Sequence, residues 1–443
     1  MTQSSELVHV PLQEFVQFLN KENIRKFFFV IDPQRGVVIS SHPKLQPIAD
    51  FLQSDTRDFA GHEGLFFQVS KRHGTLQGAF VHRTNRGQGS GGLRYWHYEK
   101  LEDFLRDGLR LSRGMTYKNA LAGLWWGGGK GVIAHERAAG IHDPRVRAAI
   151  FQEFGAFVAS LQGCYVTAED VGTNVTDMAN VFSRNRFITC IPQEYGGSGN
   201  PSMATARGIV CGMEAALEFA GAPALERKTI AVQGMGNVAV ALLRLLFERN
   251  VAKVIACDID AELVERVRNV FAGRNLEGYV VSADDISILH TGCDILAPCA
   301  IGAILNPRTI PKIRAKIICG AANNQLEDPE RDDHALFDRG IVYVPDFLVN
   351  RMGIVNCANE QYGYVLRDPF FERHLKRDWE YSVFQMTLSV LRASRTSQEP
   401  PGKVAVRRAE ELSLVDHPIF GHRGQQIISS LVEGRWHENP CDV

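Results

Sequence analysis

Two lysines and one aspartate are the side chains in this sequence best suited to acid–base chemistry. Lys118 and Lys130 bracket the stretch "KNALAGLWWGGGKG", and Asp170 lies in "YVTAEDVGTNVTDM". Lys130 follows three glycines and precedes apolar residues, so partial desolvation is expected, which lowers a lysine pKa toward values useful for proton transfer. Each residue could instead be an ordinary surface charge. The residue types alone leave both interpretations open.

A second chemical signal is the stretch "TIAVQGMGNVAVALLRLLFERNVAKVIACDID". Gly234 allows a tight turn, Gly236 lets the backbone approach a pyrophosphate, and Ala239 leaves room for a helix to pack on a strand. The helix beginning near Asn237 favours the phosphate charge. Asp258 ends the next strand, where its carboxylate could bind a ribose 2′-hydroxyl and repel a 2′-phosphate. The pattern predicts an NAD site; the alternative is a βαβ unit without a ligand.

The elements before residue 203 mix hairpins with helices. Apolar runs separated by polar glycine turns predict β-hairpins over 26–41 and 64–83. Helical spacing of apolar residues predicts a helix over 99–113. A further helix should begin after Asp143 as N-cap, with Pro144 in its first turn, and stop near Gly163.

From about residue 203 the sequence alternates short apolar runs with amphipathic segments. Apolar strands of this kind are buried on both faces, as in a parallel doubly wound sheet. The expected strands are 228–234, 253–258, 293–299, 315–320 and 341–346. Beyond 366 the chain is expected to be helical again, with an exposed loop over 395–403. The predicted fold class is therefore α/β, with two domains.

Composition excludes several classes of function. The chain has 443 residues, 45% of them hydrophobic, and a net charge of −1, which disfavours a nucleic-acid or membrane-surface binder. No apolar run is long enough to span a bilayer, and the N-terminal residues resemble no targeting signal. Nine cysteines without a CxxC pair suggest reduced thiols and a cytoplasmic location. The sequence has no HExxH motif or Cys/His cluster, so no metal site is expected.

Several segments, in order along the chain, resemble the glutamate/leucine/phenylalanine/valine dehydrogenase superfamily, and leucine dehydrogenase most closely. They are "SGGLRYWHY", "MTYKNALAGLWWGGGKGVI", "YVTAEDVGTNVTDM", "GNPSMATARGIVCGMEAAL", the GxGxxA stretch, "CGAANNQL" and "VPDFLVNRMGIVNCANEQYGY". The resemblance implies reversible, NAD-dependent oxidative deamination of an L-amino acid to a 2-oxo acid, ammonium and NADH. It also implies a homo-oligomer.

The implied architecture has a discontinuous first domain and a Rossmann domain, with catalysis in the cleft between them. Residues 1–200 would form the substrate-binding and oligomerisation domain, 201–365 the NAD-binding domain, and 366–443 a helical return to the first domain.

The resemblance also implies roles for individual residues. Lys118 would hold the substrate α-carboxylate, Lys130 would activate the water that attacks the imine, and Asp170 would exchange a proton with the amino group. The expected substrate contacts come from Gly91, Gly92, Ser90, Trp126, Ala168, Asn350, Ile354 and Cys357. Thr205 and Asn323 are expected near the substrate or the nicotinamide.

The pocket residues favour an apolar substrate. Ser90 stands where glutamate enzymes have a lysine, and burying a carboxylate without its cation costs about 3–5 kcal/mol. Ala168, Ile354 and Cys357 would form apolar walls. Trp126 is expected to touch the substrate side chain, either narrowing the pocket or offering an aromatic face.

Three departures from the family pattern leave alternatives open. Trp126 stands where the family has a leucine or methionine, Arg351 and Met352 replace a small pair, and Arg207 replaces a tyrosine or glycine. These changes could be compensated drift, or could shift the substrate to an aromatic or acidic amino acid. They could also belong to a catalytically silent NAD-binding scaffold. Retention of Lys118, Lys130 and Asp170 speaks against the last alternative.

Overall fold

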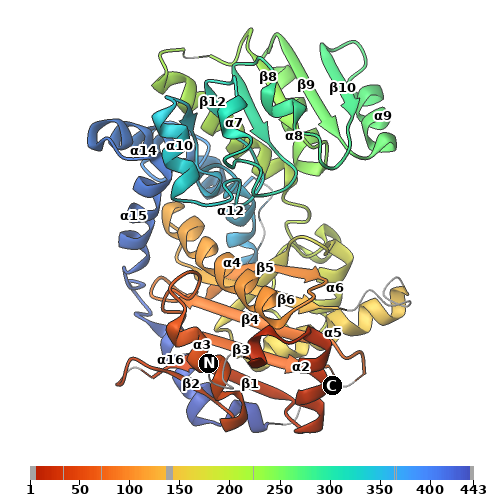
Figure 1. Ribbon diagram of the computed structural model, residues 1–443, viewed down its shortest axis with the longest axis vertical. Coiled ribbons are helices and arrows are strands. Elements are labelled where there is room, and N and C mark those ends of the chain that lie inside the picture. Colours follow the sequence, from red (N-terminus) through yellow and green to blue (C-terminus); the bar gives the residue numbers. More distant parts are fainter. Residues whose placement is uncertain are drawn as a thin grey trace.

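The computed structural model describes residues 6–439 except 33, 71, 136–142, 223, 364 and 366. The first five residues and Tyr364, the last residue of a quoted motif, lie outside the described residues. Two β-sheets lie one above the other in Figure 1, each with its own helices. None of the helices described is long and apolar enough to cross a membrane.

The first sheet is mixed and has seven strands in the order β2-β1-β3-β4-β6-β5-β7. The strands are β1 (Lys26–Ile31), β2 (Val38–Ser40), β3 (Gly64–Val69), β4 (Leu76–Arg83), β5 (Gly89–Trp96), β6 (Gly127–Ala134) and β7 (Tyr165–Glu169). Both predicted hairpins are confirmed, since β1–β2 and β3–β4 are antiparallel pairs. β5 runs parallel to both β6 and β7. These three strands bring the glycine motif, Lys130 and Asp170 to neighbouring positions.

Helices cover both faces of this sheet. They are α1 (Glu6–His9), α2 (Leu12–Lys21), α3 (Gln46–Ser54), α4 (Leu101–Leu121), α5 (Pro144–Ser160) and α6 (Val175–Phe182). The helix predicted after Asp143 is confirmed, since α5 begins at Pro144. The Asp143 carboxylate caps this helix by accepting a hydrogen bond from the Arg145 amide at 2.8 Å. Gly163 follows the helix with φ of +86°.

Helix α4 continues eight residues beyond the predicted end at 113. Its last turns bury the polar residues Ser112, Thr116 and Asn119 ahead of the apolar Ala120 and Leu121. Each polar side chain finds a partner; the Asn119 amide, for example, donates to the Gly127 carbonyl at 2.6 Å. Buried polar residues therefore interrupt the apolar pattern before the helix ends, and this extension carries Lys118.

The second sheet is entirely parallel, in the order β10-β9-β8-β11-β12-β13, which is the strand order of a Rossmann fold. Its strands are β8 (Thr229–Gln233), β9 (Lys253–Asp258), β10 (Leu276–Val280), β11 (Ile295–Pro298), β12 (Ile317–Ile318) and β13 (Val342–Tyr343). Its helices include α7 (Ser202–Phe219), α8 (Asn237–Glu248), α9 (Ala261–Val270) and α10 (Arg331–Asp338). The doubly wound sheet is confirmed. The sequence did not predict β10, an edge strand whose side chains are only partly buried.

The C-terminal helices lead the chain back to the first sheet, as the blue ribbon in Figure 1 shows. They are α11 (Asp346–Val349), α12 (Met352–Ala358), α13 (Pro369–Arg373), α14 (Val383–Ser397), α15 (Pro401–Ser413) and α16 (Arg423–Glu433). Helix α14 packs on α7 and α15 packs on α4, while Ile428 of α16 lies in the first sheet's core. The domain limits at 200 and 365 stay a prediction.

The exposed loop expected over 395–403 is wrong. Helix α14 extends to Ser397 and α15 begins at Pro401, so only three residues connect them. Gln398 ends α14 in the left-handed conformation, and Pro401 occupies the first turn of α15, where a missing amide proton has no cost. Pro401 and the preceding Pro400 are both buried. The two prolines therefore mark the start of a helix and not a loop.

Candidate active site

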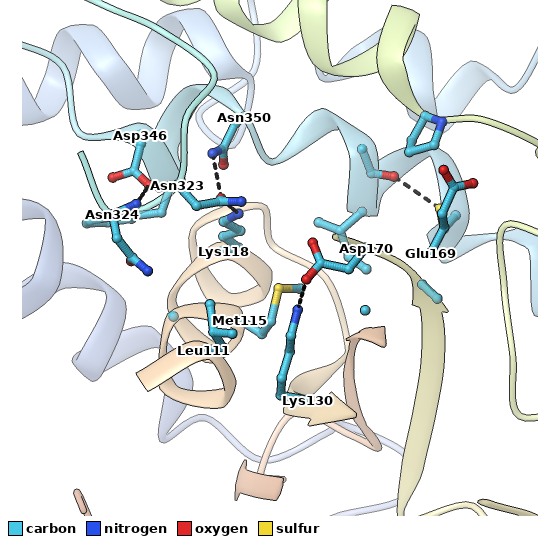
Figure 2. Close-up of a pocket in the computed structure, with 18 of the residues that line it drawn as sticks. Leu111, Met115, Lys118, Lys130, Glu169, Asp170, Asn323, Asn324, Asp346 and Asn350 are labelled. Carbon is cyan, nitrogen blue, oxygen red and sulfur yellow. Dashed lines mark hydrogen bonds and ion pairs between the residues drawn. The ribbon is translucent and has the colours of Figure 1, made fainter. Parts of the chain in front are cut away.

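A cavity of about 190 Å³ lies where the two sheets' elements meet. Lys118, Lys130 and Asp170 reach it from the first sheet and its helix α4 (Figure 2). Asn323 and Asn350 reach it from the segments that follow the Rossmann strands. The structure thus brings together residues that lie more than 200 positions apart in the sequence.

Lys130 and Asp170 form a buried ion pair and hydrogen bond. Burial lowers the pKa of Lys130, as predicted, although the Asp170 charge opposes the shift. For Asp170, burial would raise the pKa, but the charges of Lys130 and Arg94 outweigh it, and the pKa is lowered. An added Cβ at Gly92 would lie 2.7 Å from the Asp170 Cβ, so a glycine is needed there.

Arg94 also lies beside the Asp170 carboxylate of this pair, and sequence reasoning missed it. Its Nε lies 3.6 Å from Asp170 Oδ2, and its Nη1 donates to both carboxylate oxygens of Asp107 at 2.9 Å. Arg94 is two residues after Gly92 on β5, so both residues face the same side of the sheet. That period could have identified it.

Lys118 lies in a second polar cluster. Its Nζ donates to Asn323 Oδ1 at 2.8 Å, and Asn350 Nδ2 donates to the same oxygen at 2.9 Å. Burial lowers the pKa of Lys118, and the Asp346 charge opposes the shift. Asp346 Oδ2 accepts a hydrogen bond from the Asn324 amide at 2.9 Å. A buried lysine oriented by neutral amides can bind an anionic group of a ligand.

Glu169 also lines the cavity, although only Asp170 was predicted from that motif. Burial raises the pKa of Glu169 to about 7, and the Asn200 side chain, 3.3 Å from Oε1, partly offsets the shift. Its Oε2 is buried without a hydrogen-bond partner among the described residues. Its position next to Asp170 was the available signal. The cavity therefore holds a carboxyl that titrates near neutrality.

The predicted substrate contacts divide into two groups. Those that line the cavity are Lys118, Gly92, Ala168, Asn350, Ile354 and Cys357. Gly91 does not line it, because an added Cβ would point at the Gly129 carbonyl oxygen on β6. Ser90 is buried within the sheet beside Val166 and Gly128, away from the cavity lining.

Trp126 does not reach the cavity either. It is 4% exposed and lies in the hydrophobic core that also contains Leu124 and Ile209. It lies directly before β6, four positions ahead of Lys130, which corresponds to about 13 Å along extended backbone. The expected contact with a substrate side chain does not agree with this placement. Trp125 is partly exposed and lies against the Arg86 guanidinium, 4.3 Å away.

The residues that depart from the family pattern also lie outside the cavity lining. Arg351 is fully buried and donates to the carbonyl oxygens of Leu121 and Tyr381, each at 2.6 Å. Burial lowers its pKa to about 9. Arg207 forms a bidentate ion pair with Glu372 at 2.8 Å. Neither arginine is placed to pair with an acidic substrate.

Met352 is also fully buried in the core. Thr205, on α7, donates to the Pro201 carbonyl at 3.1 Å and does not line the cavity. Neither residue lines the cavity, and the expected place of Thr205 near the nicotinamide stays a prediction.

The turn between β8 and α8 has the features of a dinucleotide site. Gly234 has φ of +90°, which favours glycine, and an added Cβ would lie 2.9 Å from that of Ala300. At Gly236 an added Cβ would meet no atom within 4 Å, and no side chain among the described residues caps the helix that starts at Asn237.

Asp258 Oδ2 accepts a hydrogen bond from the Met235 amide at 2.7 Å. Ala239 is buried against the sheet. The open helix terminus and the carboxylate beside it fit NAD.

Comparison with known proteins gives two family matches. Residues 66–186 match "Glu/Leu/Phe/Val dehydrogenase, dimerisation domain", and residues 196–387 match "Glutamate/Leucine/Phenylalanine/Valine dehydrogenase". Leucine dehydrogenase of Geobacillus stearothermophilus is 45% identical over 71% of this chain and 81% of its own length. Leucine dehydrogenase of Bacillus subtilis is 43% identical over 79% of this chain and 91% of its own length. Among solved structures, L-tryptophan dehydrogenase from Nostoc punctiforme has a TM-score of 0.64 and 32% identity. The match covers 80% of this chain and 96% of that one.

The raised pKa of Glu169 predicts a pH-dependent stability. Because its pKa is about 7 in the fold against an ordinary value of 4.5, the neutral form is favoured by folding. This stabilisation is present below the ordinary pKa and is lost as the pH rises through about 7. Between roughly pH 5 and pH 8, the Tm of wild type should fall more than that of Glu169→Gln, measured by scanning calorimetry.

Glu262→Gln is the matched control, because the Glu262 side chain is 91% exposed. Its Tm should follow that of wild type across the pH range. Parallel curves for wild type and Glu169→Gln would contradict the raised pKa.

Proposed function

The chain belongs to the glutamate/leucine/phenylalanine/valine dehydrogenase family, and from this we propose that it is an amino-acid dehydrogenase with a branched-chain or other apolar L-amino acid as substrate. It carries out the reversible, NAD-dependent oxidative deamination of that amino acid to the 2-oxo acid, with release of ammonium. The convergence of Lys118, Lys130 and Asp170 on one cavity carries this proposal. The leucine dehydrogenases at 43–45% identity support the substrate class.

In the proposed mechanism each charged side chain has one task. Lys118 holds the α-carboxylate by its fixed charge, and its bonds to Asn323 orient it. Asp170, ionised beside Lys130, takes a proton from the substrate ammonium, so that the nitrogen lone pair assists the loss of hydride from Cα. Lys130, with its lowered pKa, takes a proton from the water that attacks the imine carbon. NAD, when bound, supplies the acceptor for the hydride.

The proposed NAD site consists of Gly234, Gly236, Asn237, Ala239 and Asp258. The uncapped amides at the start of α8 would bind the pyrophosphate, and Asp258 would bind the adenosine ribose. Asn323 links the two sites, because it contacts Lys118 and follows the Rossmann strand β12.

The side-chain end of the cavity supports an aliphatic substrate over an acidic one. Ala168, Ile354 and Cys357 line it. Arg110, which also lines the cavity, is already paired with the Asp58 carboxylate at 2.6 Å. A glutamate side chain would meet no unpaired cation there among the residues that the structure describes, at a cost of about 3–5 kcal/mol.

The reaction is tested with purified protein, NAD and a panel of the L-amino acids, read as NADH absorbance at alkaline pH. Leucine, valine and isoleucine are expected to give the fastest rates. Lys130→Ala should lower kcat by about 10²–10⁴-fold, because it removes the proton acceptor, while NAD still quenches tryptophan fluorescence. Lys403→Ala, at an exposed lysine of α15, is the control and should retain wild-type kcat. No NADH from any amino acid would refute the function.

Asp258 gives a separate prediction about the cofactor. Asp258→Asn keeps a side chain that can accept from the Met235 amide but removes the charge that repels a 2′-phosphate. The KM for NAD should rise by roughly tenfold or more, and the ratio of NADP to NAD turnover should increase. Steady-state kinetics with both cofactors measures this. An unchanged ratio would exclude the proposed role of Asp258.

We also propose that the protein is a cytoplasmic homo-oligomer. The match of residues 66–186 to a dimerisation domain supports self-association, as do the exposed apolar side chains of Leu414, Ile419 and Phe420. Light scattering after gel filtration should give a mass that is a multiple of 49.3 kDa. A mass equal to one chain at micromolar concentration would contradict the proposal.

A further inference from the structure

Two cysteines face each other in the wall of the amino-acid cavity. The Sγ atoms of Cys190 and Cys357 are 2.8 Å apart, although 167 positions separate them in the sequence. Both residues line the cavity, and each is 1% exposed. Cys190 follows the segment that lies beside β7, and Cys357 is on α12, beyond the Rossmann strands. The pair therefore bridges the two parts of the chain that form the site.

Hydrogen bonds hold both cysteines in place. The Glu360 carboxylate, just after α12, accepts from the amides of Cys190 and Ile191 at 2.8 and 3.0 Å and from Ser198 Oγ at 2.5 Å. Cys190 has φ of +61°, a left-handed conformation that these contacts maintain. Cys357 Sγ lies 3.1 Å from the Gly353 carbonyl oxygen within its helix. These contacts hold the two sulfurs against each other in the reduced protein.

We propose that Cys190 and Cys357 are an oxidisable thiol pair, which a peroxide converts to a disulfide that reversibly stops turnover. The inference rests on the proposed function only for its effect on turnover. The formation of the disulfide depends on the two thiols alone.

The chemistry balances with one peroxide. One thiol loses its proton, and its sulfur takes an oxygen as the O–O bond breaks, giving a sulfenic acid and one water. The second thiol then attacks that sulfur, the S–O bond breaks, and a second water leaves. The two sulfurs lose two electrons in total, and the peroxide is reduced to two waters. A dithiol reductant reverses the change by exchange.

The position of the pair explains the loss of turnover. Helix α12 also carries Ile354 and begins two residues after Asn350, while Cys190 lies on the side of Glu169 and Asp170. A bond between the sulfurs fixes the two walls of the cavity to each other. Catalysis in a cleft requires those walls to open and close around the substrate.

The environment of the thiols sets the rate. The hydrogen bond to Cys357 and burial raise the pKa of Cys190 well above its ordinary value. Since the thiolate is the reacting form, oxidation is slow at neutral pH and becomes faster as the pH rises. The pair thus stays reduced in a reducing compartment and responds to sustained peroxide.

The test uses the full-length protein, reduced and then treated with hydrogen peroxide. Peptide mapping by mass spectrometry without reductant should reveal a Cys190–Cys357 cross-linked peptide, lighter by two hydrogens than the two thiol peptides together. NADH production should fall by about tenfold or more and return after dithiothreitol. No cross-linked peptide at doses that oxidise the partly exposed Cys293 would overturn the proposal.

Variants separate this pair from other oxidation. The ratio of activity after peroxide to activity before it is compared within each variant, so differences in basal rate do not matter. Cys190→Ser and Cys357→Ser should keep a ratio near one, whereas Cys293→Ser should lose activity as wild type does. Equal losses in all three, or a disulfide that leaves turnover unchanged, would refute the effect on catalysis. If no amino acid is a substrate, the proposed function fails, and the peptide map still decides whether the disulfide forms.

Discussion

The buried ion pair between Lys130 and Asp170 is the interaction on which the site depends. Removing either charge from water is costly, and the pair is retained only if further contacts compensate for that cost. Arg94 provides one such contact, since its Nε lies 3.6 Å from Asp170 Oδ2. Asp107 in turn neutralises the charge of Arg94. Gly92 provides another by leaving space for the Asp170 side chain. Arg94 and Gly92, which belong to the motifs around Lys130 and Asp170, are thus residues that the packing of this ion pair requires.

The second constraint is that Lys118 must face residues of the Rossmann half. Helix α4 carries Lys118 to the cavity, and Arg351 fixes the end of that helix through the Leu121 carbonyl. The same guanidinium holds the Tyr381 carbonyl, at the start of the C-terminal return. Arg351 has no carboxylate partner among the described residues, and burial removes much of its hydration, which its pKa of about 9 reflects. Its contacts therefore place it at the junction between the two halves of the molecule.

Sequence reasoning succeeded where local patterns coincide with structure. The hairpins, the capped helix after Asp143 and the five Rossmann strands follow from periodicity and turn residues. It failed where tertiary contacts decide: α4 continues on buried polar residues, and prolines start α15. In the site, residue type and motif identified Lys118, Lys130 and Asp170 as a group. Trp126 was expected at the substrate but lies in the hydrophobic core, because a motif gives a residue's place along the chain and not which cavity its side chain reaches.

The departures from the family pattern follow a common logic. Arg351, Arg207 and Trp126 each have partners away from the cavity, so none of them contacts the reacting groups. Cys190 and Cys357 differ, because they are in the cavity wall itself. Two thiols fill an apolar wall as well as aliphatic side chains do, since free cysteine behaves as a small hydrophobe. The two thiols can therefore undergo oxidation at this position without loss of packing in the reduced protein. In a pocket for an apolar side chain, such a pair has little cost in folding stability.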